Sequence, residues 1–260
     1  MSDNDPIILP GPQKVVPFIG LKEGVIFPET EAVLTFGRPA SIAGINNAYS
    51  GNHEVCFVSQ KDSKITAAGL DDYYLVGTIC RIVKTLPVNE ELHAIVRGLF
   101  RVSISELQEH DGLVWAVVTE LTEDSSISNE ISALTNRAVA QIKRASELGK
   151  INVEQGVLSK ILSSSDPLLI SHQISSVLDV KNDEKQKLLE NNSLESRLTF
   201  ISSHLTEEIK ILELEKKIEN KTQKHFDESM KEAVLRERMR AIQKELGEGG
   251  EEEEITELKT

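Results

Sequence analysis

A stretch of 53 residues, from Leu194 to Leu246, contains neither glycine nor proline. These are the two residues that most readily end a helix. Ser193 can supply an N-cap oxygen before the stretch, and Gly247 stands where a helix is expected to end. The sequence therefore predicts one helix of roughly 80 Å, which is longer than a small domain is wide.

The apolar residues of this helix form two stripes with helical spacing, separated by the polar run ENKTQKH at residues 219–225. We expect the first stripe to pack inside its own domain. The second has less local chain to pack against, so it either self-associates, docks on a neighbouring module or folds back on its own chain. The residues of the first stripe are Leu194, Leu198, Ile201, Leu205, Ile209 and Leu212. The assembly candidates of the second stripe are Val234, Leu235, Met239, Ile242 and Leu246.

The net charge of −13 argues against a nucleic acid as the main ligand. Acidic and basic residues are interleaved along the long helix, as on a solvated surface. No apolar run approaches the roughly 20 residues that span a bilayer, and the start of the chain does not resemble a secretory signal. Cys56 and Cys80 lie in apolar, strand-like runs typical of buried free thiols. We therefore expect a soluble cytoplasmic protein without a membrane partner.

Residues 1–13 are expected to be a flexible arm, and residues 14–122 a β subdomain of short strands. The predicted strands include GVIFPE at residues 24–29, ELHAIVRG at 91–98 and FRVSISEL at 100–107. Asp111-Gly112 is a hairpin signal. One helix is expected among the strands, in RPASIAGINNAYSG at residues 38–51, with Pro39 in its first turn and Gly51 at its end. This pattern predicts a mostly antiparallel β-barrel or sheet.

From residue 123 the apolar period changes from two to about 3.6. Residues 123–193 therefore predict a helical bundle, with Gly149 ending its first helix, Asn152 capping the second and Asp166-Pro167 starting the third. Residues 194–246 are the long helix, and the acidic, glycine-containing residues 247–260 are expected to be a linker. The fold class is α+β.

The sequence contains no phosphate loop, no dinucleotide-binding glycine motif and no cysteine or histidine cluster with metal spacing. Serines and lysines are present, but no pattern places one beside the other as a nucleophile and base. We therefore name no catalytic, cofactor or metal residue and expect a binding module.

Several segments resemble the N-terminal region of the Lon ATP-dependent proteases, over residues 15–258. They are VVPFIGLKEGVIFPETEAVLTFGR (15–38) with its Phe27-Pro28 and Gly37-Arg38 pairs, FVSQKD (57–62), DDYYLVGTICRIV (71–83), AIVRGLFRVSI (94–104) and ERMRAIQKELGE (237–248). The family's usual Leu-Pro-Leu opening is replaced by Val16-Pro17-Phe18. The family's phosphate loop and serine–lysine dyad are missing, so the chain resembles a natural or engineered fragment.

This resemblance implies a PUA-like barrel, a helical bundle and a long helix that contacts other subunits. It also implies a homohexameric parent that uses ATP and Mg²⁺ to degrade misfolded, damaged and regulatory proteins in quality control and stress response. The fragment itself is expected to recruit unfolded substrates and to assist assembly, without cofactors of its own. Apolar residues near predicted turns are the candidate substrate contacts, although large apolar side chains more often lie in the core. These candidates are Phe27, Pro28, Leu70, Tyr73, Tyr74, Leu99 and Phe100.

Two alternatives remain. A stand-alone PUA-like module that binds RNA or a small ligand would use the helices as a dimerisation stalk, but an RNA reader needs a basic face with aromatics. Residues 14–121 contain only nine basic residues and one tryptophan, Trp115. A purely structural coiled-coil scaffold would leave the barrel unexplained.

Overall fold

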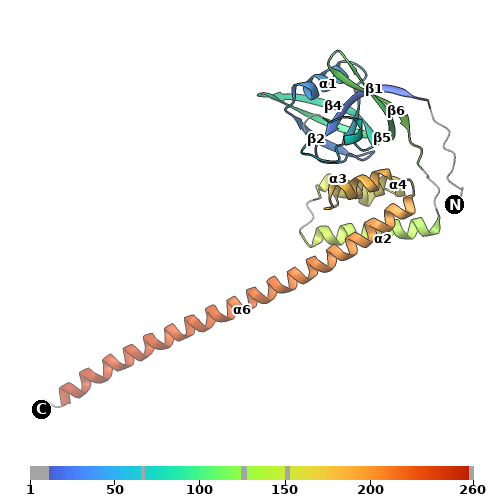
Figure 1. The fold of residues 1–260 in the computed structure, drawn as a ribbon. Helices are drawn as coiled ribbons and strands as arrows, with labels where there is room; N and C mark the ends of the chain where they lie inside the picture. The colour runs from blue at the N-terminus through green and yellow to red at the C-terminus, as the bar shows by residue number, and fades with distance from the viewer. Residues whose placement is uncertain (1–11, 66–67, 124–127, 150–152, 258–260) are drawn as a thin grey trace. The chain divides into compact units, whose positions relative to one another are not determined.

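The computed structural model describes residues 12–65, 68–123, 128–149 and 153–257, with side chains up to residue 246. The chain divides into two compact units, residues 1–208 and residues 209–260. The first unit contains a β subdomain and a helical subdomain, and the second is the C-terminal part of one long helix (Figure 1). The predicted α+β class is confirmed by this order of elements.

The six described strands form one sheet in the order β2-β5-β4-β3-β1-β6. Because β5 also pairs with β6, five of these strands close into a barrel and β2 extends the sheet from β5. All pairs are antiparallel except β1 with β3. The strands are β1 (Lys14–Leu21), β2 (Glu31–Phe36), β3 (Glu54–Ser59), β4 (Val76–Val88), β5 (Glu91–His110) and β6 (Leu113–Glu120).

Two strand predictions are wrong. Residues 24–29 form no strand, because the chain turns there and inserts Phe27 into the helical core. Residues 91–98 and 100–107 are one continuous strand, β5, whereas two separate strands were predicted. A β-carbon on Gly98 would lie 2.2 Å from the carbonyl oxygen of Phe27, so this glycine permits a close backbone approach instead of ending the strand.

The predicted hairpin at Asp111-Gly112 is confirmed, and it joins β5 to β6. Both residues have positive φ values, 54° and 73°, as a type I′ turn requires. The inserted helix is also confirmed as α1 (Pro39–Ser50), with proline in its first turn.

The helical subdomain contains four helices before the long one. They are α2 (Asn129–Glu147), α3 (Gln155–Ser163), α4 (Pro167–Val177) and α5 (Asn182–Glu190). The predicted cap of α4 is confirmed, since the Leu168 amide donates to Asp166 Oδ1 over 2.9 Å. Gly149 follows α2 with a φ of 86°, as predicted for a helix end. The predicted cap Asn152 and part of the predicted arm lie outside the described residues.

Helices α3 and α4 lie between the barrel and α2 (Figure 1). Phe27 comes from the β subdomain but packs in the core of the helical subdomain, which is built mainly from isoleucine and leucine side chains of α2 to α6. Two hydrogen bonds also join the subdomains: Gln173 donates to the Glu29 carbonyl over 2.5 Å, and Gln186 donates to the Val76 carbonyl over 2.9 Å. The two subdomains therefore form one unit.

The long helix, α6 (Leu194–Glu257), begins as predicted, with the Ser196 amide donating to Ser193 Oγ over 3.2 Å. Leu194, Leu198, Ile201 and Leu205 of the first stripe are buried. The predicted end at Gly247 is wrong, because α6 continues to Glu257. A glycine costs a helix only about 1 kcal/mol, and α6 continues through Gly249 and Gly250 as well, with no proline in this segment.

Candidate functional site

An apolar hollow lies on the outside of strands β2, β5 and β4. Strand alternation places Val33, Ile95 and Lys84 in one row across the sheet, and Thr35, His93 and Leu86 in the next. The hollow measures about 470 Å³. We call this surface the outer sheet face, and its lining residues are Val33, Lys84, Thr85, Leu86, Val88, His93 and Ile95.

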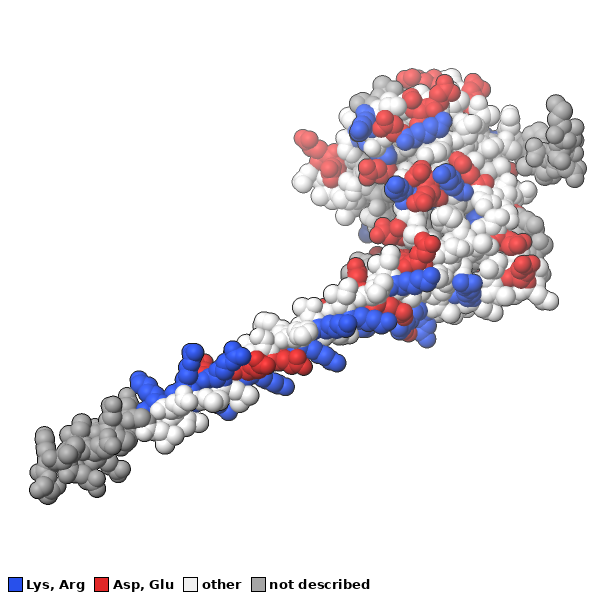
Figure 2. Space-filling model, turned by 60° about the horizontal axis from the view of Figure 1, so that its bottom comes forward, with Lys and Arg blue, Asp and Glu red and all other residues white. Residues whose placement is uncertain are grey.

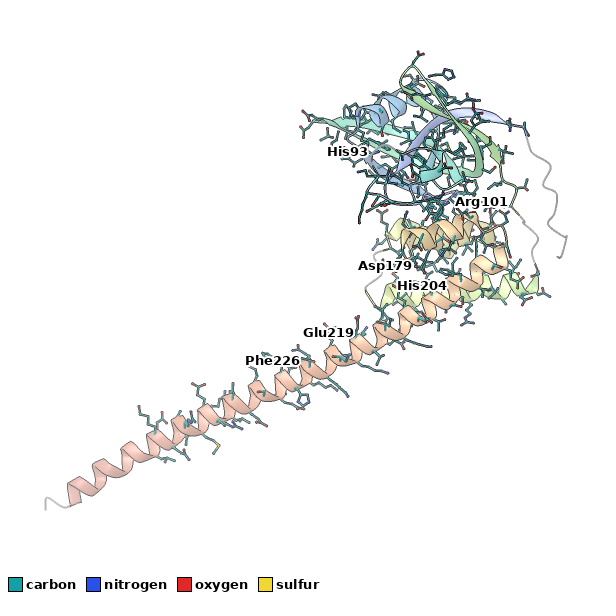
Figure 3. The ribbon with its side chains drawn as sticks, in the orientation of Figure 1. His93, Arg101, Asp179, His204, Glu219 and Phe226 are labelled. Atoms are coloured by element: carbon teal, nitrogen blue, oxygen red, sulfur yellow. The ribbon has the colours of Figure 1, made fainter. Side chains whose placement is uncertain are left out.

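The apolar side chains of the outer sheet face are unusually exposed. Val33 is 70% exposed and Leu86 is 55% exposed. His93 lies on the same face, where its Nδ1 is 3.1 Å from the Thr35 hydroxyl (Figure 3). A contiguous apolar surface of this kind marks an interaction site more often than scattered exposed residues do. The face therefore suits weak contacts with apolar side chains.

Sequence reasoning did not single out these residues. The signal was present in β2, where Ala32, Val33 and Leu34 are three consecutive apolar residues. In a strand with only one buried face, one of the two sides of such a run must be exposed.

A second pocket lies between the two subdomains of the first unit and measures about 310 Å³. It brings together three of the predicted substrate contacts, Pro28, Leu99 and Phe100. Pro28 is buried, whereas Leu99 and Phe100 are half-buried. The pocket also borders Glu123 and His172, so charged groups form part of its wall.

Four buried or nearly buried side chains at this pocket join the subdomains, and we call them the interface quartet: Arg101, Glu123, His172 and Arg197. Arg101 of β5 donates Nε to Glu123, and its Nη1 donates to the Leu189 carbonyl over 2.7 Å. Arg197 of α6 donates Nη2 to the same carboxylate over 3.0 Å. One carboxylate thus holds both subdomains (Figure 3 shows the position of Arg101).

The electrostatics of the interface quartet follow from its burial. Burial alone would raise the pKa of Glu123, but the hydrogen bond from His172 and the charges of His172, Arg101 and Arg197 lower that pKa to about 2. Burial lowers the pKa of His172, and the neighbouring guanidinium groups lower it further against the attraction of Glu123. The quartet is a structural joint and presents no free nucleophile.

Three more predicted contacts, Leu70, Tyr73 and Tyr74, lie in or directly after the short 3-10 helix η1 (Leu70–Asp72). Tyr73 is buried, and its ring meets the edge of Phe18 at a centroid distance of 5.0 Å. Leu70 and Tyr74 are partly buried against the same β core as Leu99 and Phe100. Phe27, at 0% exposure, and Tyr73 offer almost no surface to a substrate, so they are core residues in this structure.

Metal sites and reactive thiols are two further kinds of chemistry to consider among the described residues. Within residues 12–65, 68–123, 128–149 and 153–246, no group of three or more His, Cys, Asp or Glu side chains could hold a metal ion. Cys56 and Cys80 are buried free thiols, as predicted, and burial raises the pKa of both. In the same part of the chain, no helix is long and apolar enough to cross a membrane.

Comparison with known proteins decides the family. The family model described as the ATP-dependent protease La (LON) substrate-binding domain matches residues 15–207. This chain belongs to the Lon substrate-binding domain family. The match covers the barrel, the helical bundle and the start of α6.

Relatives agree with this Lon assignment. The chain is 32% identical over 237 residues to the Lon protease of Syntrophomonas wolfei, covering 91% of this chain and 29% of that protein. It is 30% identical over 235 residues to the Lon protease of Escherichia coli strain K12, covering 90% of this chain and 30% of that protein. The chain therefore spans about 30% of the length of the curated relatives it matches, and it corresponds to their N-terminal region.

Solved structures show the same Lon fold. The N-terminal domain of a Mycobacterium avium complex Lon protease superposes with a TM-score of 0.62 and 19% identity, covering 74% of this chain and 98% of that one. The Lon N-terminal domain protein from Xanthomonas campestris gives a TM-score of 0.53 and 15% identity, covering 73% of this chain and 98% of that one.

Beyond residue 207, the Lon chain continues in α6, where the assembly candidates lie. All five are exposed, from Val234 at 49% to Leu246 at 72%. Leu235, Met239, Ile242 and Leu246 alternate steps of four and three, the seam of a coiled coil, and Val234 lies one position off it. Uncharged side chains alternate with charged ones along the visible face of the helix (Figure 2).

The same register holds earlier in the second unit. Ile211, Leu214 and Ile218 are exposed and occupy the same heptad positions as the later seam. Lys221, His225, Glu228 and Glu232 occupy these positions in between. The helix therefore offers one seam with apolar ends and a charged middle.

Proposed function

We propose that this chain captures exposed apolar segments of unfolded or damaged proteins for a Lon protease, and that its contact surface is the outer sheet face. The observation that carries the proposal is the exposed apolar hollow around Val33 in a domain of the Lon substrate-binding family. Unfolded proteins expose apolar side chains that a folded protein buries. A shallow apolar surface binds such side chains with little sequence preference.

We further propose that the seam of α6 takes part in subunit assembly. When two helices pair, the leucine, isoleucine and methionine side chains at seam positions are removed from water. This burial stabilises the pair by about 25 cal/mol per Å² of apolar area. The charged middle of the seam, from Lys221 to Glu232, would limit which register pairs. The exposure of all five assembly candidates supports this role.

The catalytic steps belong, in this proposal, to the part of a Lon protease that the chain does not span. The family relationship is the basis for proposing that the parent protein binds ATP and Mg²⁺, cleaves peptides, forms a homohexameric ring and is cytoplasmic. The chain itself acts as a non-catalytic recruiter. Residues 1–260 alone should therefore neither hydrolyse ATP nor cleave peptides.

The test measures binding of a permanently unfolded test protein to residues 1–260, with its folded form as a control. Val33→Asp combined with Leu86→Asp places two charges on the outer sheet face and should weaken capture at least about tenfold, because each carboxylate must be desolvated against apolar side chains. Both positions are exposed, so the fold should survive.

The matched control adds the same charge elsewhere. Val114→Asp combined with Leu162→Asp alters two exposed apolar residues outside the outer sheet face. This variant should bind as the unchanged chain does. Equal loss in both variants, or no loss in either, would contradict the assignment of capture to the outer sheet face.

A further inference from the structure

Strand β2 has one edge without a partner strand. It pairs with β5 on one side only, and no other described strand lies in register with it. The Gly98 amide donates to the Thr30 carbonyl over 2.9 Å, so the backbone groups of Thr30 face β5. In an antiparallel pair the hydrogen-bonding residues alternate. The backbone N–H and C=O groups of Glu31, Val33 and Thr35 therefore face away from β5, toward the open edge.

A groove runs along this edge. It measures about 350 Å³ and is lined by residues 33–36 of β2 on one side and by residues 20–23, at and after the end of β1, on the other. We call it the edge groove. Val33 lines both the edge groove and the outer sheet face. A chain lying beside β2 would therefore place every second side chain beside the apolar hollow.

Arg38 lies at the end of the edge groove beside Phe36, and Lys22 and Glu23 are the other charged residues that line the groove. Arg38 Nη2 is buried and has no hydrogen-bond partner among the described residues. Arg38 is also the N-cap residue of α1, and its side chain makes no capping hydrogen bond. An acidic side chain at this end would be attracted by the guanidinium charge of Arg38 and by the positive end of α1.

We propose that the edge groove receives an extended segment of unfolded polypeptide as an added strand, antiparallel to β2, with an acidic residue before an alternating apolar run. The proposal rests on the function proposed above and names how the substrate is held. Antiparallel pairing puts the beginning of the incoming segment near Phe36, and hence its acidic residue near Arg38. Backbone hydrogen bonds supply binding that does not depend on sequence, and alternate side chains contact the outer sheet face.

This geometry makes a sharp prediction about the incoming amides. In an antiparallel pair, the residue directly opposite Val33 has its side chain on the same face and exchanges both hydrogen bonds with it. The apolar residues of the segment should therefore be the ones whose N–H groups point at β2. The intervening residues should point their N–H groups away from it.

The probe is an N-acetylated peptide of aspartate followed by alternating valine and threonine, with a C-terminal lysine for solubility. N-methylation of the valines removes the amides that face β2 and should weaken binding to residues 1–260 about tenfold or more. N-methylation of the threonines should change binding less than about threefold, since those amides face solvent. Equal binding of the two methylated peptides would overturn the pairing.

Two protein variants provide a second test. Thr35→Pro removes an outward N–H without removing a backbone hydrogen bond to β5, although it also removes the side-chain contact of Thr35 with His93. It should weaken binding of the peptide, and the melting temperature shows whether the fold is kept. Arg38→Gln should weaken binding of the aspartate peptide, whereas binding of a peptide with asparagine in place of the aspartate should not change. If Arg38→Gln affects both peptides alike, the charge pairing is wrong.

The outcomes separate this inference from the proposed function. If the methylated peptides bind equally while the two charges on the outer sheet face still weaken capture, the added strand is wrong and the apolar surface stands. If those charges change nothing, the proposed function fails as well. A second copy of this chain could also occupy the edge groove, and light scattering tests for such a dimer. A dimer that excludes the peptide from the edge groove would overturn the inference.

Discussion

The guanidinium of Arg197 on α6 donates to the carboxylate of Glu123 over 3.0 Å, and both side chains are almost fully shielded from water. The same carboxylate accepts from Arg101, which is fully buried on β5. The carboxylate therefore links the barrel to the helix that leaves the first unit. Three interactions converge on Glu123, because His172 also lies within 3.2 Å of it.

Glu123→Gln should destabilise the first unit by about 3–5 kcal/mol, because it leaves two buried guanidinium groups without a counter-charge. Chemical denaturation of residues 1–260 measures the change in the free energy of unfolding. Glu120→Gln is the matched control at an exposed site and should stay within about 0.5 kcal/mol of the unchanged chain. A small effect of Glu123→Gln would show that the joint is held by packing alone.

Acid should loosen the same joint. The pKa of Glu123 is lowered from 4.5 to about 2, so its stabilising effect is complete above pH 4.5 and is lost as the pH falls toward 2. A difference of this size corresponds to about 3 kcal/mol. His172 acts in the same direction. Because its pKa is lower in the folded chain, the unfolded chain binds a proton more readily below about pH 6.5, and acid therefore favours unfolding.

The measurement is the difference in unfolding free energy between the unchanged chain and Glu123→Gln at several pH values. This difference should be constant from pH 7 to about pH 5 and should shrink below pH 4.5, because a protonated carboxyl resembles the amide. A difference that stays constant down to pH 3 would contradict the low pKa of Glu123.

Gly98→Ala should destabilise the chain by about 1–3 kcal/mol, because its new β-carbon would lie 2.2 Å from the Phe27 carbonyl oxygen and force the Phe27 turn away from β5. Thermal unfolding provides the measurement. Gly156→Ala in α3 is the control: it meets nothing within 4 Å and should be neutral or slightly stabilising. Unchanged stability of Gly98→Ala would mean that the turn moves without cost.

Leu235→Asp combined with Ile242→Asp should abolish self-association of residues 1–260, because each charge would be desolvated in a paired seam. Sedimentation or light scattering at several concentrations measures the oligomeric state. Ala233→Asp combined with Ala241→Asp adds the same charge outside the seam and should leave association unchanged. If both pairs behave alike, α6 does not assemble through this seam.

Local chemistry in the sequence was sufficient to predict much of the fold. The helix start at Ser193, the Asp166-Pro167 cap and the Asp111-Gly112 turn were all predicted correctly, because each depends on residues within a few positions. The family resemblance was also readable from short segments in order. The helix end at Gly247 was predicted wrongly, since glycine without a following proline is a weak stop in a long helix.

The candidate site could not be predicted in the same way. Phe27 and Val33 are both apolar residues near predicted strand ends, yet Phe27 is buried in the helical core and Val33 is 70% exposed. Their difference depends on packing partners distant in sequence, such as His172 on α4 for Phe27. The interface quartet could not be predicted for the same reason, because its four residues come from four separate segments of the chain.

The sequence by itself determined the class of fold, the positions of the helix caps and the hairpin turn, and the family. These follow from backbone preferences and from apolar periodicity, which act over one or two turns of chain. Only the tertiary structure decided which apolar side chains remain exposed, which strand edge is open and which charges are buried together. Burial depends on what the rest of the chain places against a residue, and that is a property of the folded whole.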